Sequence, residues 1–270
     1  AGLFFLSGCG AVKIGVTKEY PIDEPLGGAG VTEVQVVMGA GKLTISPGAP
    51  GLASGAIRCN VLEWAPDIKR SEGKLVIRQG NRKGLSGWEP QATNEWRLQL
   101  GKAPIRLQVE AGAYEGNYDL SGLTLLGLRI KDGAAKTKVM FNAPNPGQME
   151  SFFYETGAST VSVIGLANAN CKSVKFKVGA GSYTFDFSGQ LRSDCRVDIE
   201  AGAGTVKISV PASTPARIAI SGSLNLVTTT GPWVAAGGVY STPVVGTDPQ
   251  AKLISIAVKM SVGSLTLAAE

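Results

Sequence analysis

Apolar and polar residues alternate along most of the second half of the chain, and a short Gly-rich phrase interrupts the alternation at regular intervals. "FKVGAGSYTFD" covers residues 176–186, and "IEAGAGTVKIS" covers residues 199–209. A period of two is typical of a β-strand with one buried face. The pattern therefore predicts two strands in each repeat, joined by a tight turn in which glycine adopts a positive φ.

The repeat has a nearly constant length. The first residues of the successive turns are Gly112, Gly133, Gly157, Gly179, Gly202, Ser221 and Ser261. The steps between them are 21, 24, 22, 23, 19 and 40 residues, and a regular period in this range indicates stacked coils. We therefore expect an all-β protein in which residues 108–270 form a two-faced β-solenoid of about 22-residue coils.

The outward position two residues before each turn supports this register. It holds Glu110, Lys131, Glu155, Lys177, Glu200, Ala219 and Lys259. The sign of the charge alternates over the first five residues of this column. In-register coils bring such neighbours to about 4.8 Å, where opposite charges attract and like charges repel. The charge ladder therefore favours one register, and it does not indicate catalysis.

Two segments depart from the period. Residues 29–107 are predicted to form a separate N-terminal β domain, although residues 34–46 carry the Gly-rich phrase in what reads as an isolated hairpin. Residues 227–252 are rich in Gly, Pro and Thr, and we expect them to cap the stack near its end. Trp233 and Tyr240 in this segment either cover the core or stack on a sugar ring.

Composition restricts the chemistry. The chain is 44% hydrophobic and 17% charged, which argues against disorder. It contains no histidine, which excludes Ser-His-Asp and Cys-His catalysis and disfavours a zinc site. We therefore expect neither a metal nor a cofactor.

The N-terminal segment resembles the end of a bacterial lipoprotein signal peptide. An apolar run leads into Leu6, Ser7 and Gly8, which precede Cys9. The resemblance implies that residues 1–9 end in a lipobox, that Cys9 carries a lipid, and that residues 10–28 form a tether. The expected location is extracytoplasmic, on a bacterial membrane, where nucleic acid is not an expected partner.

Three further cysteines are available for oxidation outside the cytoplasm. Cys171 and Cys195 are 24 residues apart, so they fall in adjacent coils with an offset of one residue. The spacing is within reach of a disulfide, whereas a one-residue offset in a regular strand points the two side chains to opposite faces. We predict the Cys171–Cys195 bond and a free thiol at Cys59.

A basic cluster lies in the N-terminal part. It consists of Lys69, Arg70, Lys74, Arg78, Arg82 and Lys83. These side chains could bind anionic lipid headgroups or a cell-wall polymer. Alternatively, they blunt strand edges against aggregation.

Nearly all of the chain after Cys9 resembles the bacterial toast-rack surface proteins. The resemblance rests on "MGAGKLTISPG", "EWAPDI", "LVIRQG", "EWRLQL" and "VEAGAYEGNYDLSGLTLLGLRIKDGAAK". It implies an N-terminal toast-rack domain followed by adhesin-like solenoid repeats, with a relationship to proteins that respond to cell-wall-active antibiotics. These motifs are structural, so the resemblance transfers no catalytic residues.

Two functions are compatible with these features. The first is a non-enzymatic envelope lipoprotein that binds a cell-wall polymer, a glycan or an envelope protein, or that senses envelope stress. The alternative is a polysaccharide-active enzyme on a β-helical scaffold, which would require clustered acidic and basic side chains. The acidic residues are spread along the strands, and this favours the first function.

Overall fold

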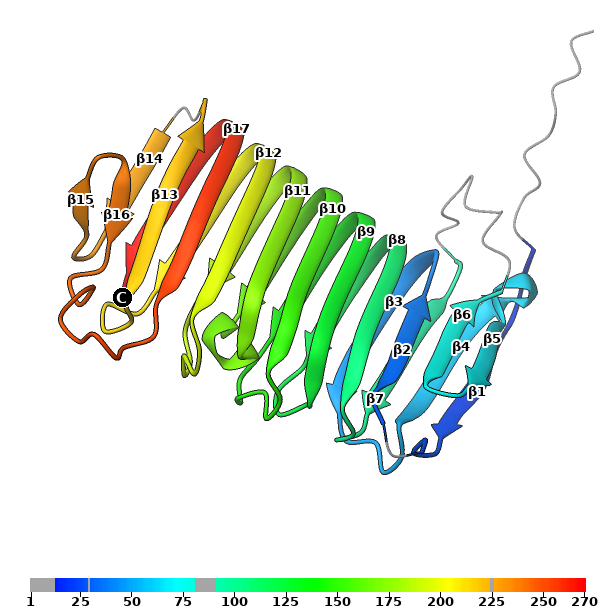
Figure 1. Ribbon diagram of the computed structural model, residues 1–270. Coiled ribbons are helices and arrows are strands. Elements are labelled where there is room, and N and C mark those ends of the chain that lie inside the picture. Colours follow the sequence, from blue (N-terminus) through cyan, green and yellow to red (C-terminus); the bar gives the residue numbers. More distant parts are fainter. Residues whose placement is uncertain (1–12, 29, 81–90, 224–225) are drawn as a thin grey trace, which may run out of the picture.

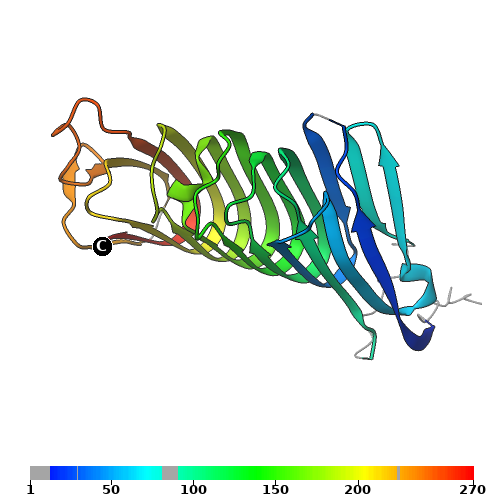
Figure 2. The ribbon, with the colours of Figure 1, turned by 90° about the horizontal axis from the view of Figure 1, so that it is seen from below.

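The computed structural model describes residues 13–28, 30–80, 91–223 and 226–270, and its strands form one continuous stack. Figures 1 and 2 show the strands side by side in two layers along this stack. The helices in the described ranges are the short 3-10 segments η1 (Leu62–Trp64) and η2 (Leu166–Ala169), neither of which could span a membrane. The expected all-β solenoid is confirmed.

Six long strands form the central coils, and each of them contributes to both layers. They are β8 (Ile105–Asp119), β9 (Leu125–Met140), β10 (Met149–Ile164), β11 (Cys171–Asp186), β12 (Cys195–Val210) and β17 (Ile254–Ala269). From β8 to β12, the parallel pairings follow the 21-, 24-, 22- and 23-residue steps of the sequence repeat. Sequence neighbours one period apart are therefore spatial neighbours.

Alternating inward positions form one continuous core. Phe176 is in register with Ile199, and both are almost completely buried. The rings of Phe176 and Phe185, which lie on opposite sides of the bend of β11, stack with centroids 4.0 Å apart. Phe152 packs edge-on against Phe176 from the neighbouring coil, at 5.5 Å. Contacts of this kind join the two layers as well as successive coils.

The Gly-Ala-Gly phrase forms a bend within a strand, and the prediction of a separate turn is wrong. Parallel pairing continues on both sides of it, from Thr156–Val178 to Ala158–Ala180. The first glycine of the phrase has no positive φ in these coils. It is required because a Cβ atom on Gly179 would lie 2.1 Å from the carbonyl oxygen of Gly157 in the adjacent coil.

The second glycine of the phrase adopts the positive φ that the sequence suggested for both glycines. Gly204 and Gly263 have φ values of 123° and 129°, in a region that L-residues rarely adopt. Other coils carry Tyr114 or Ser159 at this position, without a positive φ. Close backbone approach at the first glycine, which recurs from Gly112 to Gly202, is therefore the more general feature, and positive φ is needed only in some of the coils.

The N-terminal part continues the same stack across the predicted boundary at residues 107/108. β2 (Thr32–Val37) and β3 (Ala40–Pro47) form the two halves of one coil and pair in parallel with the two halves of β8. Residues 34–46 are therefore a coil and not an isolated hairpin. The period is interrupted here because strands between Pro47 and Ile105 pair with the other side of this coil before β8 pairs with it.

Antiparallel strands complete the N-terminal end. β6 (Lys74–Gln79) and β7 (Asn94–Leu100) extend the two layers in parallel from β2 and β3. β5 (Pro66–Ser71) then pairs antiparallel with β6, and β4 (Ala53–Val61) with β7. Finally, β1 (Ile14–Glu24) pairs antiparallel with β4.

The C-terminal strand β17 is inserted out of sequence order. It lies between β12 and the last coil, which consists of β13 (Ala216–Gly222) and β14 (Leu226–Thr230). The prediction that this coil directly follows β12 is therefore wrong. Ile199 pairs with Val258, and Val258 pairs with Ile220. The alignment on Ser221 is thus displaced by two residues from the spatial register.

The insertion of β17 extends the charge ladder. Lys259 lies directly beside Glu200, and Ser221 rather than Ala219 lies beyond Lys259. Starting from Glu110, charges of opposite sign therefore alternate over six adjacent strands. The regular sign pattern was predicted, but its sixth member comes from a strand far away in the sequence.

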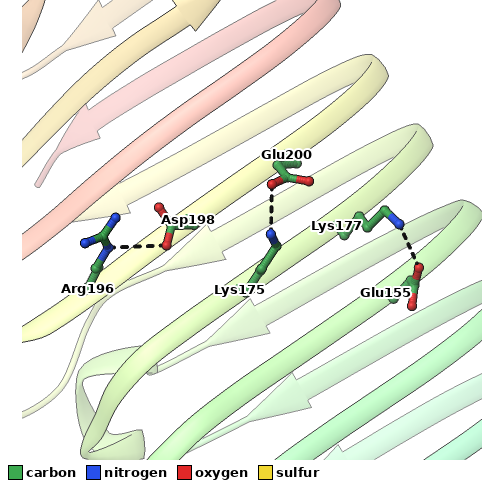
Figure 3. Close-up of polar contacts among 6 residues, drawn as sticks. All are labelled: Glu155, Lys175, Lys177, Arg196, Asp198 and Glu200. Atoms are coloured by element: carbon green, nitrogen blue, oxygen red, sulfur yellow. Dashed lines mark hydrogen bonds and ion pairs between the residues drawn. The ribbon is translucent and has the colours of Figure 1, made fainter.

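Ion pairs link the middle of the ladder. The ammonium groups of Lys131 and Lys177 lie 2.9 and 3.1 Å from the Glu155 carboxylate. They hold the pKa of Glu155 below its ordinary value. Figure 3 shows the Lys177–Glu155 pair together with a diagonal pair, in which Lys175 lies 2.8 Å from Glu200. Since these side chains are about half exposed to solvent, the ion pairs favour register more than stability.

The predicted disulfide is not present in the structure, in which Cys59, Cys171 and Cys195 are free thiols. The pairing of β11 with β12 begins only at Ser173 and Arg196, so the two cysteines are not in register with each other. Both are nevertheless buried. Burial raises the pKa of Cys171 to about 11 and that of Cys195 to about 12.

Replacement of Gly179 by alanine tests the close approach of the coils. We expect Gly179→Ala to lower the free energy of unfolding by more than about 1 kcal/mol, because the new methyl group meets the Gly157 carbonyl. Urea-induced unfolding measures this change. Gly28→Ala is the matched control, since no atom lies within 4 Å of a Cβ atom there. Equal, small effects of both substitutions would contradict the proposed packing.

Thiol counting tests the state of the cysteines. In the Cys9→Ser chain we expect three reactive thiols after denaturation without reductant, corresponding to Cys59, Cys171 and Cys195. In the native chain at pH 8, reaction should be slow, because a raised pKa leaves little thiolate. A single thiol after denaturation would instead demonstrate the Cys171–Cys195 bond that the sequence predicted.

Candidate functional site

A groove crosses the outer surface of the stack where β17 is inserted. It has a volume of about 630 Å³ and is lined by residues of β11, β12, β17, β13 and β16 (Val239–Ser241). Its floor carries the small outward side chains of Ser255, Ala257 and Ala219. The corresponding position on β12 holds the longer Asp198, which pairs with Ala257. The groove therefore forms because short side chains lie beside longer ones on a continuous sheet.

Three cationic side chains, those of Lys172, Arg196 and Arg217, line the groove. Arg196 and Arg217 occupy the positions on either side of Ser255, on β12 and β13. Arg196 pairs with Asp198 at 3.4 Å. Within the described ranges, neither Lys172 nor Arg217 forms an ion pair. These two cations are therefore available to an anionic ligand.

The acidic residues of the groove are already engaged. The Asp194 carboxylate accepts a hydrogen bond from the backbone N–H of Leu253 at 3.0 Å, and Asp198 accepts one from Arg196. The Cys195 thiol also borders the groove, but burial raises its pKa to about 12, so it is a poor nucleophile. This arrangement suits binding better than acid–base chemistry.

Sequence reasoning did not identify the groove. Arg196 and Arg217 flank Ser255 only because β17 lies between β12 and β13. A weak signal was nevertheless present. Ser255 and Ala257 are small residues at outward positions where the preceding coil carries Arg196 and Asp198.

Three of the four described members of the predicted basic cluster form ion pairs with carboxylates. Lys69 and Arg70 lie on β5, and Lys74 and Arg78 on β6, whereas Arg82 and Lys83 fall outside the described residues. Lys69 lies 3.0 Å from Asp67, Arg70 3.2 Å from Glu24, and Lys74 2.7 Å from Glu33. These contacts favour the alternative reading, in which the charges protect the strand edge.

Trp233 and Tyr240 pack against the core at the end of the stack. Tyr240 lies in β16 (Val239–Ser241), which pairs with β15 (Val234–Ala236) in a hairpin and places Tyr240 opposite Ile218 of β13. Trp233 is half-buried, and its indole N–H donates to the carbonyl oxygen of Thr230. This geometry favours the core-covering role over sugar stacking.

A second polar cluster lies at the bend of β9, and it was not predicted. Tyr154 donates a hydrogen bond to Asp132 at 2.7 Å, and Tyr114 donates one at 3.3 Å. Tyr118 in turn donates to Tyr114. Burial raises the pKa of Asp132, and hydrogen bonds from hydroxyl groups oppose this shift. The cluster joins three coils. The sequence feature that could have revealed it is Asp132, an acidic residue at the position where the adjacent coil carries Ala111.

Two further expectations from the sequence concern the absence of a metal site and the lipid on Cys9. In the described ranges, no three His, Cys, Asp or Glu side chains gather in a way that could hold a metal ion. Cys9 lies outside the described residues. Its acylation remains a prediction.

Comparison with solved structures shows a shared fold. A crystal structure of a proposed cell adhesion protein from Clostridium sporogenes is 21% identical, with a TM-score of 0.52, and the match covers 94% of this chain and 100% of that one. At this identity, the likeness concerns the fold alone.

Two further structures are less similar. A proposed adhesin from Bacteroides fragilis is 10% identical with a TM-score of 0.33, and the match covers 93% of this chain and 96% of that one. A proposed lipid-binding protein from Parabacteroides distasonis is 12% identical with a TM-score of 0.35, with coverage of 92% and 96%.

Sequence comparison gives a more specific result. No curated protein matches the chain. The family model for the N-terminal domain of toast_rack, DUF2154, matches residues 12–150 and so includes β1 to β9. Because the match covers more than half of the chain, the protein belongs to the toast-rack N-terminal domain family.

Proposed function

We propose that this chain is a non-enzymatic envelope protein, held to a bacterial membrane by a lipid on Cys9, whose solenoid binds an anionic cell-wall polymer. The observation that carries the proposal is the groove at the inserted strand β17, with Lys172 and Arg217 free to meet a ligand. The lipid anchor is supported by the sequence of Leu6–Cys9. The name of the Clostridium sporogenes structure is consistent with a surface role.

An extended ligand fits the groove better than a small compact one. The groove lies on the outer surface of a sheet, and its floor consists of the small side chains of Ser255, Ala257 and Ala219. A polymer with regularly spaced negative groups can follow such a surface while two cations fix its position. Lys172 and Arg217 supply those cations.

The enzyme alternative receives no comparable support from the groove. Glycoside hydrolysis requires two carboxyl groups flanking the scissile bond, one of which must transfer a proton. Asp194 is held by the backbone of Leu253, and Asp198 by Arg196. These carboxylates therefore serve the structure of the groove wall.

Intact-mass analysis tests the lipid anchor. We expect the precursor expressed in bacteria to lose the segment before Cys9 and to gain the mass of acyl groups on that residue, because "LSGC" follows an apolar run. The Cys9→Ser chain is the control and should remain unprocessed. An unmodified Cys9 still joined to its upstream segment would contradict the anchor.

Charge reversal in the groove tests the ligand class. We expect the unaltered chain to bind poly(glycerol phosphate) in a salt-dependent manner and to bind neutral dextran weakly or not at all. In the Lys172→Glu/Arg217→Glu chain, the affinity for the polyanion should fall about tenfold, which corresponds to about 1.4 kcal/mol. Titration calorimetry at two salt concentrations measures both effects.

Two lysines on the opposite layer provide the matched control. Lys136 and Lys138 are exposed on the second half of β9, and replacing both by glutamate changes the net charge by the same amount. Affinity should change little in this variant. Equal losses in both double variants would indicate a general charge effect, and a lack of binding by the unaltered chain would reject the polymer as ligand.

A further inference from the structure

The end of the stack at β1 and η1 exposes apolar side chains. Val16 is 85% exposed and Leu62 is 67% exposed. These are the two highest values among the large hydrophobic side chains in the part of the chain that the structure describes. Both line a pocket of about 260 Å³ between β1 and β4, together with Tyr20 and Val61. A soluble surface usually buries such groups or scatters them singly.

A bulge in β1 creates this surface. Ile14 pairs with Val61 and Lys18 pairs with Cys59, so four steps along β1 correspond to two steps along β4. The additional residues leave the regular ladder, and Val16 lies among them. Bulges of this kind redirect side chains, and here the redirected side chain is apolar and points to solvent.

The chain length restricts where this surface lies if Cys9 carries a lipid. Lys13, the first described residue, also lines the pocket and follows Cys9 by four residues. Four residues span at most about 14 Å when fully extended. An acyl group on Cys9 would therefore hold the pocket within reach of the lipid headgroups.

The charges around the pocket are compatible with a bilayer. Lys13 and Lys18 line it and form no ion pair within the described ranges, whereas Glu19 pairs with Arg58 at 3.6 Å. Glu63 is the acidic residue of the pocket lining. Lysines near a bilayer attract its anionic headgroups, and exposed apolar side chains enter its interface, so this end of the stack offers both contributions.

We propose that this end of the solenoid is a membrane-facing surface, in which Val16 and Leu62 enter the interfacial region of the bilayer and Lys13 and Lys18 meet its headgroups. This inference rests on the proposed lipid at Cys9. In this orientation the stack extends away from the membrane, because β1 and the β13–β17 region lie at opposite ends of it (Figure 1).

The orientation places the groove far from the bilayer. The pairings lead from β1 through β4, β7, β3, β8, β9, β10, β11 and β12 to β17, which is nine interstrand steps. At about 4.8 Å for each step, β17 lies roughly 43 Å from β1 along the stack. The groove would thus project toward the cell wall or the exterior.

Site-specific fluorescence on the acylated chain tests the orientation. Val16→Cys, Leu62→Cys and Val234→Cys chains are labelled with an environment-sensitive dye and reconstituted in phosphatidylcholine vesicles with or without phosphatidylglycerol. Val234 is the matched control, since it is 57% exposed and lies at the opposite end of the stack. The native thiols at Cys59, Cys171 and Cys195 are buried and should remain unlabelled.

We expect the dye at positions 16 and 62 to shift to shorter wavelength in vesicles and to be quenched by nitroxide-bearing lipids, more strongly with phosphatidylglycerol present. The dye at position 234 should do neither. Equal responses at all three positions would mean that the stack lies flat on the bilayer, and no response at positions 16 and 62 would reject a membrane-facing end.

Intact mass on the same samples separates the two proposals. A chain that carries acyl groups but gives no response at positions 16 and 62 contradicts the membrane-facing surface and leaves the lipid anchor in place. A chain without acyl groups contradicts the anchor and, with it, this orientation.

Discussion

Neighbouring coils approach each other so closely at the bend that most of them carry glycine there, where a Cβ atom would crowd the adjacent backbone. A Cβ atom on Gly157 or Gly179 would lie 2.6 or 2.1 Å from the carbonyl oxygen of the preceding glycine, which excludes it, whereas on Gly133 it would lie at 3.1 Å and force the neighbour to shift. The bend allows one strand to belong to both layers, so each of the six long strands contributes to both faces without an intervening loop. The ordered columns of the core, including Phe152, Phe176 and Ile199, depend on this alignment because a shift of one residue would turn each strand inside out.

The insertion of β17 completes the C-terminal end. This strand brings Lys259 beside Glu200 and so continues the alternation of charges across six strands. The same insertion places Ser255 and Ala257 between the longer side chains of β12 and Arg217 of β13. One rearrangement of chain order therefore accounts both for the extended ladder and for the groove.

The two ends of the stack differ in chemistry. At the N-terminal end, Val16 and Leu62 are exposed beside two lysines, and the edge strand β5 carries charges that are mostly paired. At the C-terminal end, the β15–β16 hairpin covers part of the core with Trp233 and Tyr240. This polarity suits a protein that contacts a membrane at one end and a ligand near the other, and the charge ladder between them maintains register.

The sequence alone determined the features that repeat. Parallel in-register coils convert a fixed sequence period into spatial neighbours, so the alternation around Phe176 and Ile199 and the pairing of Glu155 with Lys177 could be inferred without coordinates. The missing histidines likewise excluded whole classes of catalysis.

The tertiary structure decided everything that depends on where the chain returns after leaving the period. Residues 32–47 join the stack, β17 precedes β13 in space, and Glu24 and Glu33 form ion pairs with two residues of the basic cluster, although each of these contacts connects distant parts of the sequence. A local pattern specifies which face of a strand is buried, but not which strand lies beside it once a long segment intervenes. The groove and the free thiols of Cys171 and Cys195 follow from that path and from the offsets it creates.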